Sequence, residues 1–381
     1  MRANSATTVV VGMSGGVDSS VAAHLLREQG YRVIGLFMKN WEEKDENGVC
    51  TSAQDFEDVR AVCNRLDIPY YSVEFVREYW DNVFTHFLRE YEAGYTPNPD
   101  ILCNREIKFN LFMKKALNEV GGDFLATGHY ARVGNDFELL KGLDPGKDQS
   151  YFLYTLKNEI LKKVLFPIGD IQKSQVRKVA ESAGLATARK KDSTGIRFIG
   201  ERNFGKFLSQ YVQAKPGKIK TLKGDVVGEH LGVCYYTLGQ RKGLGLGGEG
   251  EAYFVVGKDP VKNIVYVERG STHPALYTDS LMATELSWVG AVPGVTPGYD
   301  LPLRCRAKTR YRQEDQSCTI TRIEGDRITV EFDEPQRSVT PRQSVVFYLG
   351  EICMGGAMIE APGLNYNELG KPLPVLGLSI S

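Results

Sequence analysis

The chain has 381 residues, of which 42% are hydrophobic and 25% charged, a composition that excludes an intrinsically disordered protein and suggests two or three domains. Lys plus Arg and Asp plus Glu both number 47, so no overall basic excess indicates a nucleic-acid partner. Locally the charge is uneven. Residues 41–100 hold 14 acids and 5 bases, a net of −9, whereas residues 141–220 hold 17 bases and 7 acids, a net of +10. A basic region of this size either attracts a polyanion or is a solvated face.

The seven cysteines are scattered without a CxxC pair, which argues against a disulfide scaffold and a structural zinc site; they are Cys50, Cys63, Cys103, Cys234, Cys305, Cys318 and Cys353. The N-terminus lacks the basic start and apolar core of a signal peptide, and no run of about 18 apolar residues predicts a membrane span. We therefore expect a cytoplasmic, reduced protein that does not contact a membrane.

The first half of the chain alternates short β-branched runs with helical periodicity, which is typical of a parallel sheet with crossover helices. The expected strands are residues 7–11, 31–38, 70–75 and 124–127. The expected helices are residues 19–28, 54–66, 78–91, 108–120 and 174–183.

After residue 207 glycine and proline become more frequent and closely spaced short strands replace the helical pattern, which favours small barrels or sandwiches. The clearest strands are residues 253–256, 264–267, 303–308, 318–323, 327–332 and 344–348. We place domains at 1–206, 207–275 and 276–362, and expect a loosely ordered tail at 363–381.

The first chemical signal lies between the first strand and the first helix. The segment runs Gly12, Met13, Ser14, Gly15, Gly16, Val17, Asp18, Ser19, Ser20. Glycines allow a tight turn, and the free N–H groups of the next helix point toward an anion. The segment lacks the Lys of a P-loop and the spacing of GxGxxG. SGGVDSS resembles the PP-loop of ATP pyrophosphatases, which implies ATP binding with Asp18 as a partner for Mg²⁺. The alternative is a helix start without a ligand.

A thiol and a carboxylate lie three residues apart in Asn98-Pro99-Asp100-Ile101-Leu102-Cys103-Asn104, which we expect to form a loop before the helix at 108. Such a carboxylate can exchange protons with a substrate, and a thiol near a helix start gains thiolate character. The alternative interpretation is that Cys103 is a small buried hydrophobic residue.

Six further blocks occur in order with this one: FMKNW (37–41), ATGHYAR (126–132), GKDQSYFLY (146–154), KDSTGIRFIGER (191–202), TLGQRKGLGLGG (237–248) and KTRYRQ (308–313). Together they resemble the bacterial tRNA-specific 2-thiouridylase family over residues 7–360. The resemblance implies an α/β PP-loop domain of the adenine nucleotide α-hydrolase type, a small central domain and a C-terminal β-barrel. It also implies thiolation of the wobble uridine of Lys, Glu and Gln tRNAs, with ATP and a sulfur-relay persulfide donor protein.

The resemblance assigns roles residue by residue. Cys103 would be the catalytic thiol and Asp100 the general acid/base. ATP would contact Gly12 to Ser19, Met38 and Gly128, whereas tRNA would contact Asn98, Pro99, Asp100, His129, Lys147, Asp148, Gln149, Arg310, Tyr311 and Gln343. Arg310 and Tyr311 offer a charge and a stacking face, as flipped bases require. DNA is not an expected partner.

One position departs from the family pattern. The family block reads STGICFIG, and its Cys carries the persulfide, whereas this chain has Arg197 there. Arginine cannot bear a sulfane sulfur. Either its charge holds a phosphate or a sulfide donor, or the substitution removes function. Adenylation of the uridine O2 does not need this second thiol.

Three functions therefore compete: an ATP-dependent tRNA sulfurtransferase, a tRNA- and ATP-binding family member without turnover, and a small-molecule PP-loop ligase. The loop alone fits all three, since NAD and GMP synthetases share it. The blocks around Cys103, His129 and Gln149 argue against the ligase. Formation of 2-thiouridine separates the first two.

Overall fold

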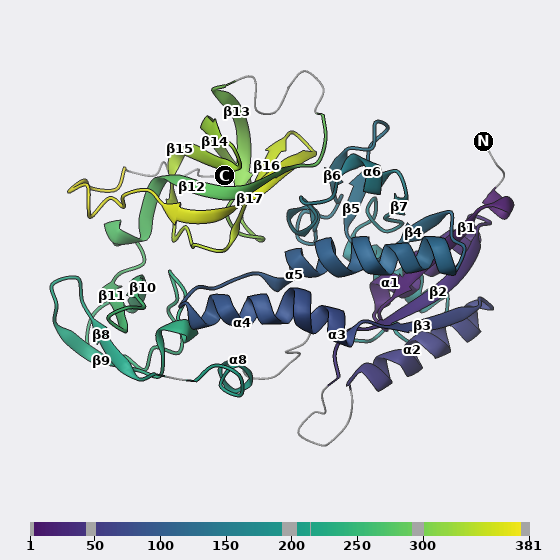
Figure 1. Cartoon of the computed structure of the whole chain (residues 1–381), viewed down its shortest axis with the longest axis horizontal. Coiled ribbons are helices and arrows are strands. Elements are labelled where there is room, and N and C mark those ends of the chain that lie inside the picture. Colours follow the sequence, from purple (N-terminus) through teal and green to yellow (C-terminus); the bar gives the residue numbers. More distant parts are fainter. Residues whose placement is uncertain (1–3, 43–50, 193–203, 214, 292–300, 375–381) are drawn as a thin grey trace.

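The computed structural model describes residues 4–42, 51–192, 204–213, 215–291 and 301–374 (Figure 1). Within these ranges the chain forms a parallel sheet covered by helices, a small antiparallel-rich sheet and a β-barrel. No helix in the described ranges is long and apolar enough to cross a bilayer.

The N-terminal sheet has five parallel strands in the order β3-β2-β1-β4-β7. Their bounds are β1 Thr8–Met13, β2 Arg32–Lys39, β3 Tyr70–Glu74, β4 Phe124–Ala126 and β7 Val164–Leu165. The strand order reverses at β1, and in such sheets ligands bind beyond the carboxyl ends of the strands at this point. The segment Ser14–Gly16 follows directly from β1 there.

Alternation along β1 explains the two layers of helices. Val9 and Val11 pack with α1 (Val17–Glu28), α2 (Thr51–Leu66) and α7 (Lys173–Ser182) on one face. Val10 packs on the other face against Phe109 and Phe112 of a long helix. The segment Ser14–Gly16, which follows β1, therefore emerges between two buried layers of helices.

The long helix starts earlier than the sequence predicts. It opens with α5 (Pro99–Leu102) and continues as a π-helical stretch, Cys103–Phe112, and another, Lys115–Glu119. Asn98 is its N-cap, since the Asn98 side chain accepts a hydrogen bond from the Asp100 N–H at 3.1 Å. Proline at the first helical position needs no N–H partner. The expected loop at 98–104 is thus wrong, and Asp100 and Cys103 lie in the first turns of a helix.

Neighbouring elements complete this domain. A second helix runs from α3 (Val76–Tyr79) through a π-helical turn, Trp80–Phe84, into α4 (Thr85–Glu92). The remaining short helices are Asn4–Ala6, Ser150–Phe152 and α6 (Asn158–Leu161).

The central part begins with α8 (Phe204–Leu208) and forms a four-stranded sheet in the order β10-β11-β8-β9. The strands are β8 Gly217–Lys220, β9 Val226–His230, β10 Tyr253–Asp259 and β11 Ile264–Arg269, with 3₁₀ turns at Val233–Tyr235 and Pro274–Leu276. Its core contains Val255, Val265 and Val267, all fully buried.

The C-terminal sheet closes into a six-stranded barrel, because β12 pairs with both β15 and β17. The strands are β12 Tyr277–Trp288, β13 Leu303–Lys308, β14 Gln316–Glu324, β15 Arg327–Arg337, β16 Ser344–Leu349 and β17 Ile352–Pro362. A hairpin from the first half, β5 (Ala131–Val133) and β6 (Leu139–Lys141), extends this sheet through β6–β17 pairing. The sequence does not predict this exchange between the two domains.

The first part of the expected loose tail packs onto the fold. The Tyr366 side chain is buried with Phe254, Leu276 and Tyr277, and its N–H donates to the Tyr277 carbonyl at 3.1 Å. Burial of an aromatic ring and a backbone hydrogen bond hold residues 363–371 against the barrel, contrary to the expectation from their irregular sequence pattern.

Candidate nucleotide and thiol site

The loop after β1 has the geometry of an anion site. Gly16 precedes the first turn of α1, and the Gly15 backbone has a φ of +71°, which favours glycine. The Ser14 N–H donates to Ser19 Oγ at 3.1 Å, and Ser20 Oγ donates to the Gly16 carbonyl at 2.8 Å. Ser14 and Gly16 remain partly exposed beside the helix N-terminus, where an anion is stabilised.

Glycines also allow other segments to approach this loop. A Cβ on Gly15 would lie 2.6 Å from the Asp55 carbonyl oxygen of α2. A Cβ on Gly128, just beyond β4, would lie 2.7 Å from the Ser19 nitrogen and 2.8 Å from the Asp18 carbonyl carbon. The structure thus brings Gly128 into close contact with the predicted loop, and Gly15 brings the loop close to α2.

Asp18 anchors an ion-pair network that the sequence does not predict. Asp18 Oδ1 accepts hydrogen bonds from Tyr130 Oη and Lys173 Nζ, each at 2.7 Å. Lys173 Nζ is also 2.9 Å from Asp192 Oδ1, and Lys147 Nζ donates to Asp192 Oδ2 at 2.8 Å. Burial opposes ionisation of Asp192, but these hydrogen bonds hold its pKa well below the usual range. The Lys173 ammonium beside the loop is therefore paired with two carboxylates, those of Asp18 and Asp192.

Met38 lies near the end of β2, at the position predicted from the sequence, and its contact with ATP stays a prediction. Its side chain is partly buried and packs against both the cluster under the long helix and the one around Phe84. It is thus fixed at the same edge of the sheet as Gly12 and Gly128.

Cys103 is buried, with 6% of its surface exposed. It packs in an aromatic cluster with Tyr79, Phe84 and Phe207. Asp100, one turn earlier on the same helix, is partly exposed. The two groups therefore lie on consecutive turns of one rigid element, but the thiol is at its buried side.

His129 is oriented by neighbours that the sequence analysis did not single out. Thr127 Oγ1 lies 2.8 Å from His129 Nδ1, and Lys108 Nζ lies 3.4 Å from His129 Nε2. Lys108 Nζ also donates to Asn104 Oδ1 at 2.8 Å, and Asn104 Nδ2 donates to the Phe152 carbonyl at 2.9 Å. The i, i+4 spacing of Asn104 and Lys108 is the signal that could have identified this chain of contacts.

The predicted tRNA residues Lys147, Asp148 and Gln149 have different environments. Asp148 is 5% exposed and accepts hydrogen bonds from the Gly142 and Ser150 N–H groups and from Ser150 Oγ. It stabilises the turn. Lys147 and Gln149 are partly exposed, and Gln149 Oε1 accepts from the Tyr130 N–H at 3.0 Å.

The predicted residues of the barrel lie where the domains meet. The Arg310 guanidinium donates to the carbonyls of Leu238 and Ser338 at 3.2 and 2.7 Å, joining the central part to the barrel. Tyr311 packs on Phe152 with ring centroids 4.4 Å apart, and burial raises the pKa of Tyr311 to about 12. Its hydroxyl donates to the Lys147 carbonyl at 3.3 Å.

Gln343 belongs to the same group of interdomain contacts. Its Nε2 donates to the Thr96 carbonyl at 2.5 Å, two residues before the Asn98 cap. The sequence prediction for Gln343 is a tRNA contact, and in this structure its side chain supports the segment in front of the thiol helix.

Arg197 lies outside the described residues, and so does Cys50. Asp192 forms ion pairs with Lys147, Lys173 and Arg177, and it is the last described residue before residues 193–203. No cluster of His, Cys, Asp or Glu in the described ranges is arranged to hold a metal ion.

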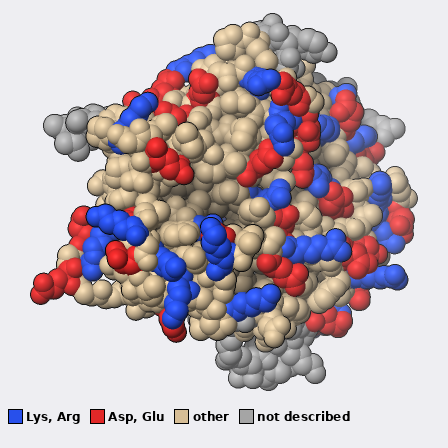
Figure 2. All heavy atoms as spheres, turned by 60° about the vertical axis from the view of Figure 1, so that its left-hand side comes forward, with Lys and Arg blue, Asp and Glu red and all other residues tan. Residues whose placement is uncertain are grey.

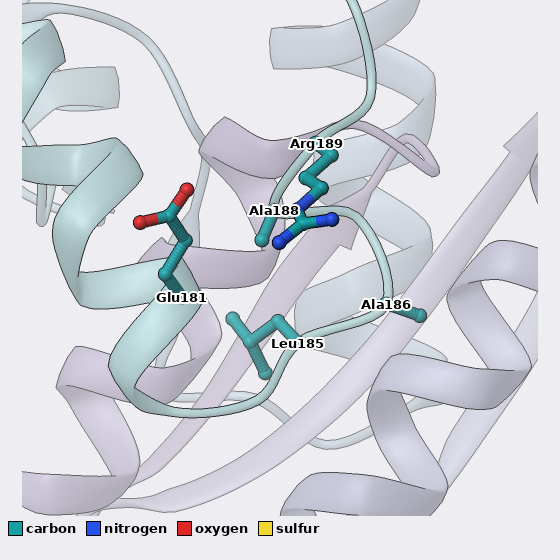
Figure 3. Close-up of a pocket in the computed structure, with 5 residues that line it drawn as sticks. All are labelled: Glu181, Leu185, Ala186, Ala188 and Arg189. Atoms are coloured by element: carbon teal, nitrogen blue, oxygen red, sulfur yellow. The ribbon is translucent and has the colours of Figure 1, made fainter.

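A surface cavity of about 350 Å³ lies at the end of α7, and Figure 3 shows Glu181, Leu185, Ala186, Ala188 and Arg189 around it. It contains none of the predicted site residues. The face of the molecule in Figure 2 carries Lys and Arg interspersed with Asp and Glu instead of one uniform basic field. Acids from outside the segment offset part of the basic excess of residues 141–220, since Lys173 pairs with Asp18 and Lys190 pairs with Asp55 and Asp58.

The fold and the site together define a class of protein. It has a parallel α/β domain with a PP-loop where the strand order of the sheet reverses, followed by two β domains. Three family models match the chain in order. The tRNA methyl transferase HUP domain matches residues 7–201, the tRNA methyl transferase PRC-barrel domain residues 205–269 and the aminomethyltransferase beta-barrel domain residues 278–359.

Relatives identify the family. The tRNA-specific 2-thiouridylase MnmA of Protochlamydia amoebophila is 62% identical over 372 residues, which cover 96% of this chain and 97% of that protein. The protein of the same name from Exiguobacterium sibiricum is 56% identical, over 94% of this chain and 95% of its own. The chain belongs to the tRNA-specific 2-thiouridylase family, a family of sulfurtransferases, which confirms the predicted family and fold class.

Among solved structures, the U34-tRNA thiolase NcsA of Methanococcus maripaludis is 20% identical, with a TM-score of 0.33, over 50% of this chain and 62% of its own. This likeness is too low to bear on function.

Proposed function

We propose that this chain activates the wobble uridine of tRNA with ATP and prepares it for thiolation. The observation that carries the proposal is the close contact of Gly128 with the N-terminus of α1, because it joins the PP-loop to the segment that holds His129 and Tyr130. An anion bound by the free N–H groups of α1 would lie beside these residues. Adenylation consumes ATP, and the loop offers a site for its phosphates.

In the proposed reaction, Ser14, Gly15, Gly16 and Ser19 bind the phosphates of ATP. The uridine O2 attacks the α-phosphorus, the bond to the β-phosphate oxygen breaks, and pyrophosphate leaves. Asp100, partly exposed at the start of the thiol helix, moves the proton of the base. A sulfur nucleophile then attacks C2, and AMP departs with the former O2.

Mg²⁺ fits beside the loop at Asp18, whose carboxylate side chain is 33% exposed. It would neutralise charge on the phosphates when bound. Because Asp18 is paired with Lys173 here, this role requires that the carboxylate and the ammonium separate, and Lys173 then keeps its ion pair with Asp192.

The substrate preference that we propose is the set of Lys, Glu and Gln tRNAs, with Lys147, Gln149 and Tyr311 at the RNA and a persulfide-carrying protein as donor. We place the reaction in the cytoplasm. With domain boundaries near 206 and 275, the RNA then contacts the nucleotide-binding part at Lys147 and Gln149 and the barrel at Tyr311.

Arg197 limits the sulfur step. A relay through a protein persulfide needs a thiol at this position, and arginine has none. We therefore expect ATP binding, tRNA binding and tRNA-dependent pyrophosphate release, but little 2-thiouridine with a persulfide donor. A catalytically impaired tRNA-binding protein is the second candidate, favoured by this one residue.

The test is to incubate the purified chain with ATP, Mg²⁺ and an unmodified tRNA transcript that has a wobble uridine, and to measure pyrophosphate and 2-thiouridine separately. Pyrophosphate that appears only with the tRNA supports the proposal. Release without RNA, stimulated by a small amine or acid, would indicate a small-molecule ligase.

A further inference from the structure

The segment that leads into the thiol helix is held from outside its own domain. Gly94 ends the turn after α4, and four residues later Asn98 caps the helix of Asp100 and Cys103. The Gly94 carbonyl accepts a hydrogen bond from Lys258 Nζ of β10 at 2.6 Å. A Cβ on Gly94, whose φ is +85°, would lie 2.7 Å from Pro260 Cγ. The central part therefore packs directly on this turn.

Two further contacts hold the same segment. Thr96 Oγ1 lies 3.2 Å from Thr237 Oγ1 of the central part. The Thr96 carbonyl accepts from Gln343 Nε2 of the barrel. The segment between α4 and Asn98 is thus held by both β domains. The helices that flank it, α4 and the thiol helix, belong to the N-terminal domain.

Lys258 is a buried lysine at the contact between the central part and the turn at Gly94. Its ammonium donates to two backbone carbonyls, those of Gly94 and Tyr236 at 2.6 and 2.7 Å. Among the residues that the structure describes, these two carbonyls are the hydrogen-bond partners of the ammonium, and it forms no ion pair with a carboxylate. Burial lowers the pKa of Lys258 to about 8, so the charged form is held at a cost in folding free energy. An apolar side chain of the same length would fill the space without that cost.

We propose that Lys258 is a positioning residue: by holding the Gly94 carbonyl it fixes the Gly94–Asn98 segment and hence the start of the helix that carries Asp100 and Cys103. This inference rests on the proposed function for its catalytic consequence. A shift of about 1 Å in a catalytic group can slow a reaction about 100-fold. A small displacement of this turn is therefore sufficient to lower kcat.

The experiment compares Lys258→Met with Lys262→Met, an exposed lysine of the following turn whose ammonium pairs with Asp259. Three assays are used: the kinetics of tRNA-dependent pyrophosphate release, which give kcat and the KM for ATP; hydrogen–deuterium exchange of peptides over 93–103; and thermal unfolding, which gives the midpoint. We expect Lys258→Met to lower kcat at least 10-fold, leave KM within twofold, accelerate exchange over 93–103 and leave the midpoint unchanged or raised. Lys262→Met should match the parent in all three.

A second variant, Thr237→Val, keeps the side-chain volume and removes the hydroxyl contact to Thr96; it should lower kcat about threefold. The inference is overturned if Lys258→Met keeps the parental kcat and exchange. It is also overturned if the midpoint falls and exchange rises throughout the central part, since Lys258 would then only stabilise the fold. If the parent chain releases no pyrophosphate with tRNA, the proposed function fails, and exchange over 93–103 still decides whether Lys258 holds this segment.

Discussion

Replacement of Gly128 by alanine tests the contact between the nucleotide loop and the segment after β4. The added Cβ would lie 2.7 Å from the Ser19 nitrogen and 2.8 Å from the Asp18 carbonyl carbon. Both neighbours are backbone atoms of the first turn of α1, so no flexible side chain can move aside. Normal contact needs about 3.5 Å, and the two segments must separate by about 0.8 Å.

The size of this separation allows its effects on stability and on kcat/KM to be estimated. Overpacking at a buried contact costs about 1–3 kcal/mol, so Gly128→Ala should remain folded but less stable. A displacement of this magnitude at the phosphate site should lower kcat/KM for ATP about 100-fold. The assay is tRNA-dependent pyrophosphate release across a range of ATP concentrations, with far-ultraviolet circular dichroism to confirm folding.

Gly247→Ala provides the matched control, because a Cβ there meets no atom within 4 Å and its φ is not in the left-handed region. It should behave as the parent. If Gly128→Ala keeps a parental kcat/KM for ATP, the loop and the segment after β4 do not form one nucleotide site, and the reasoning fails.

Four further predictions follow from the structure and, for Arg197, from the sequence. Asp18→Ala should abolish tRNA-dependent pyrophosphate release yet keep the fold, because the Asp18 side chain is 33% exposed and belongs to none of the apolar clusters that form the core of the described residues; unchanged release would contradict the assignment of the loop to ATP. Affinity for tRNA should fall steeply between about 50 and 200 mM salt, although less than a charge of +10 suggests, since Lys173 pairs with Asp18 and Lys190 with Asp55 and Asp58, all outside the basic segment; a flat dependence would argue against tRNA. Arg197→Cys should restore 2-thiouridine formation from a persulfide donor, and adding Cys103→Ala should abolish it; equal thiolation by the parent would show that the second thiol is dispensable. The folded pKa of Lys258, about 8, is below the unfolded value of 10.5, so the unfolded state binds more protons between these pH values and the free energy of unfolding should rise with pH there by about 3 kcal/mol; Lys258→Met should lose that rise in urea titrations at pH 7.5 and 10.

Much of the fold follows from the sequence because its signals are local. The β-branched run before Gly12 and the alternation of strand and helix predict the parallel sheet, and the structure has β1 at Thr8–Met13. The start of the thiol helix was also a local signal, the Asn98-Pro99 pair, but a polar residue before proline fits a loop equally well.

Other features depend on partners that are far apart in the chain. The hairpin β5–β6 belongs to the barrel because β6 pairs with β17 more than 200 residues later, and its short length gives no sequence signal of that partner. Lys173 and Asp192 become part of the site only because α7 packs beside α1, which brings the ammonium to Asp18. Pairings of this kind are set by tertiary packing and not by periodicity.

The central claim is that the loop at Gly12–Ser19 binds the ATP with which a tRNA base is adenylated. The most direct measurement is pyrophosphate release by the purified chain with ATP and a tRNA transcript whose wobble position is uridine, beside the same transcript with cytidine at that position. The account predicts release with the uridine transcript and at least a 10-fold lower rate with the cytidine transcript or without RNA. Equal rates in the three reactions, or no release in any of them, would contradict it.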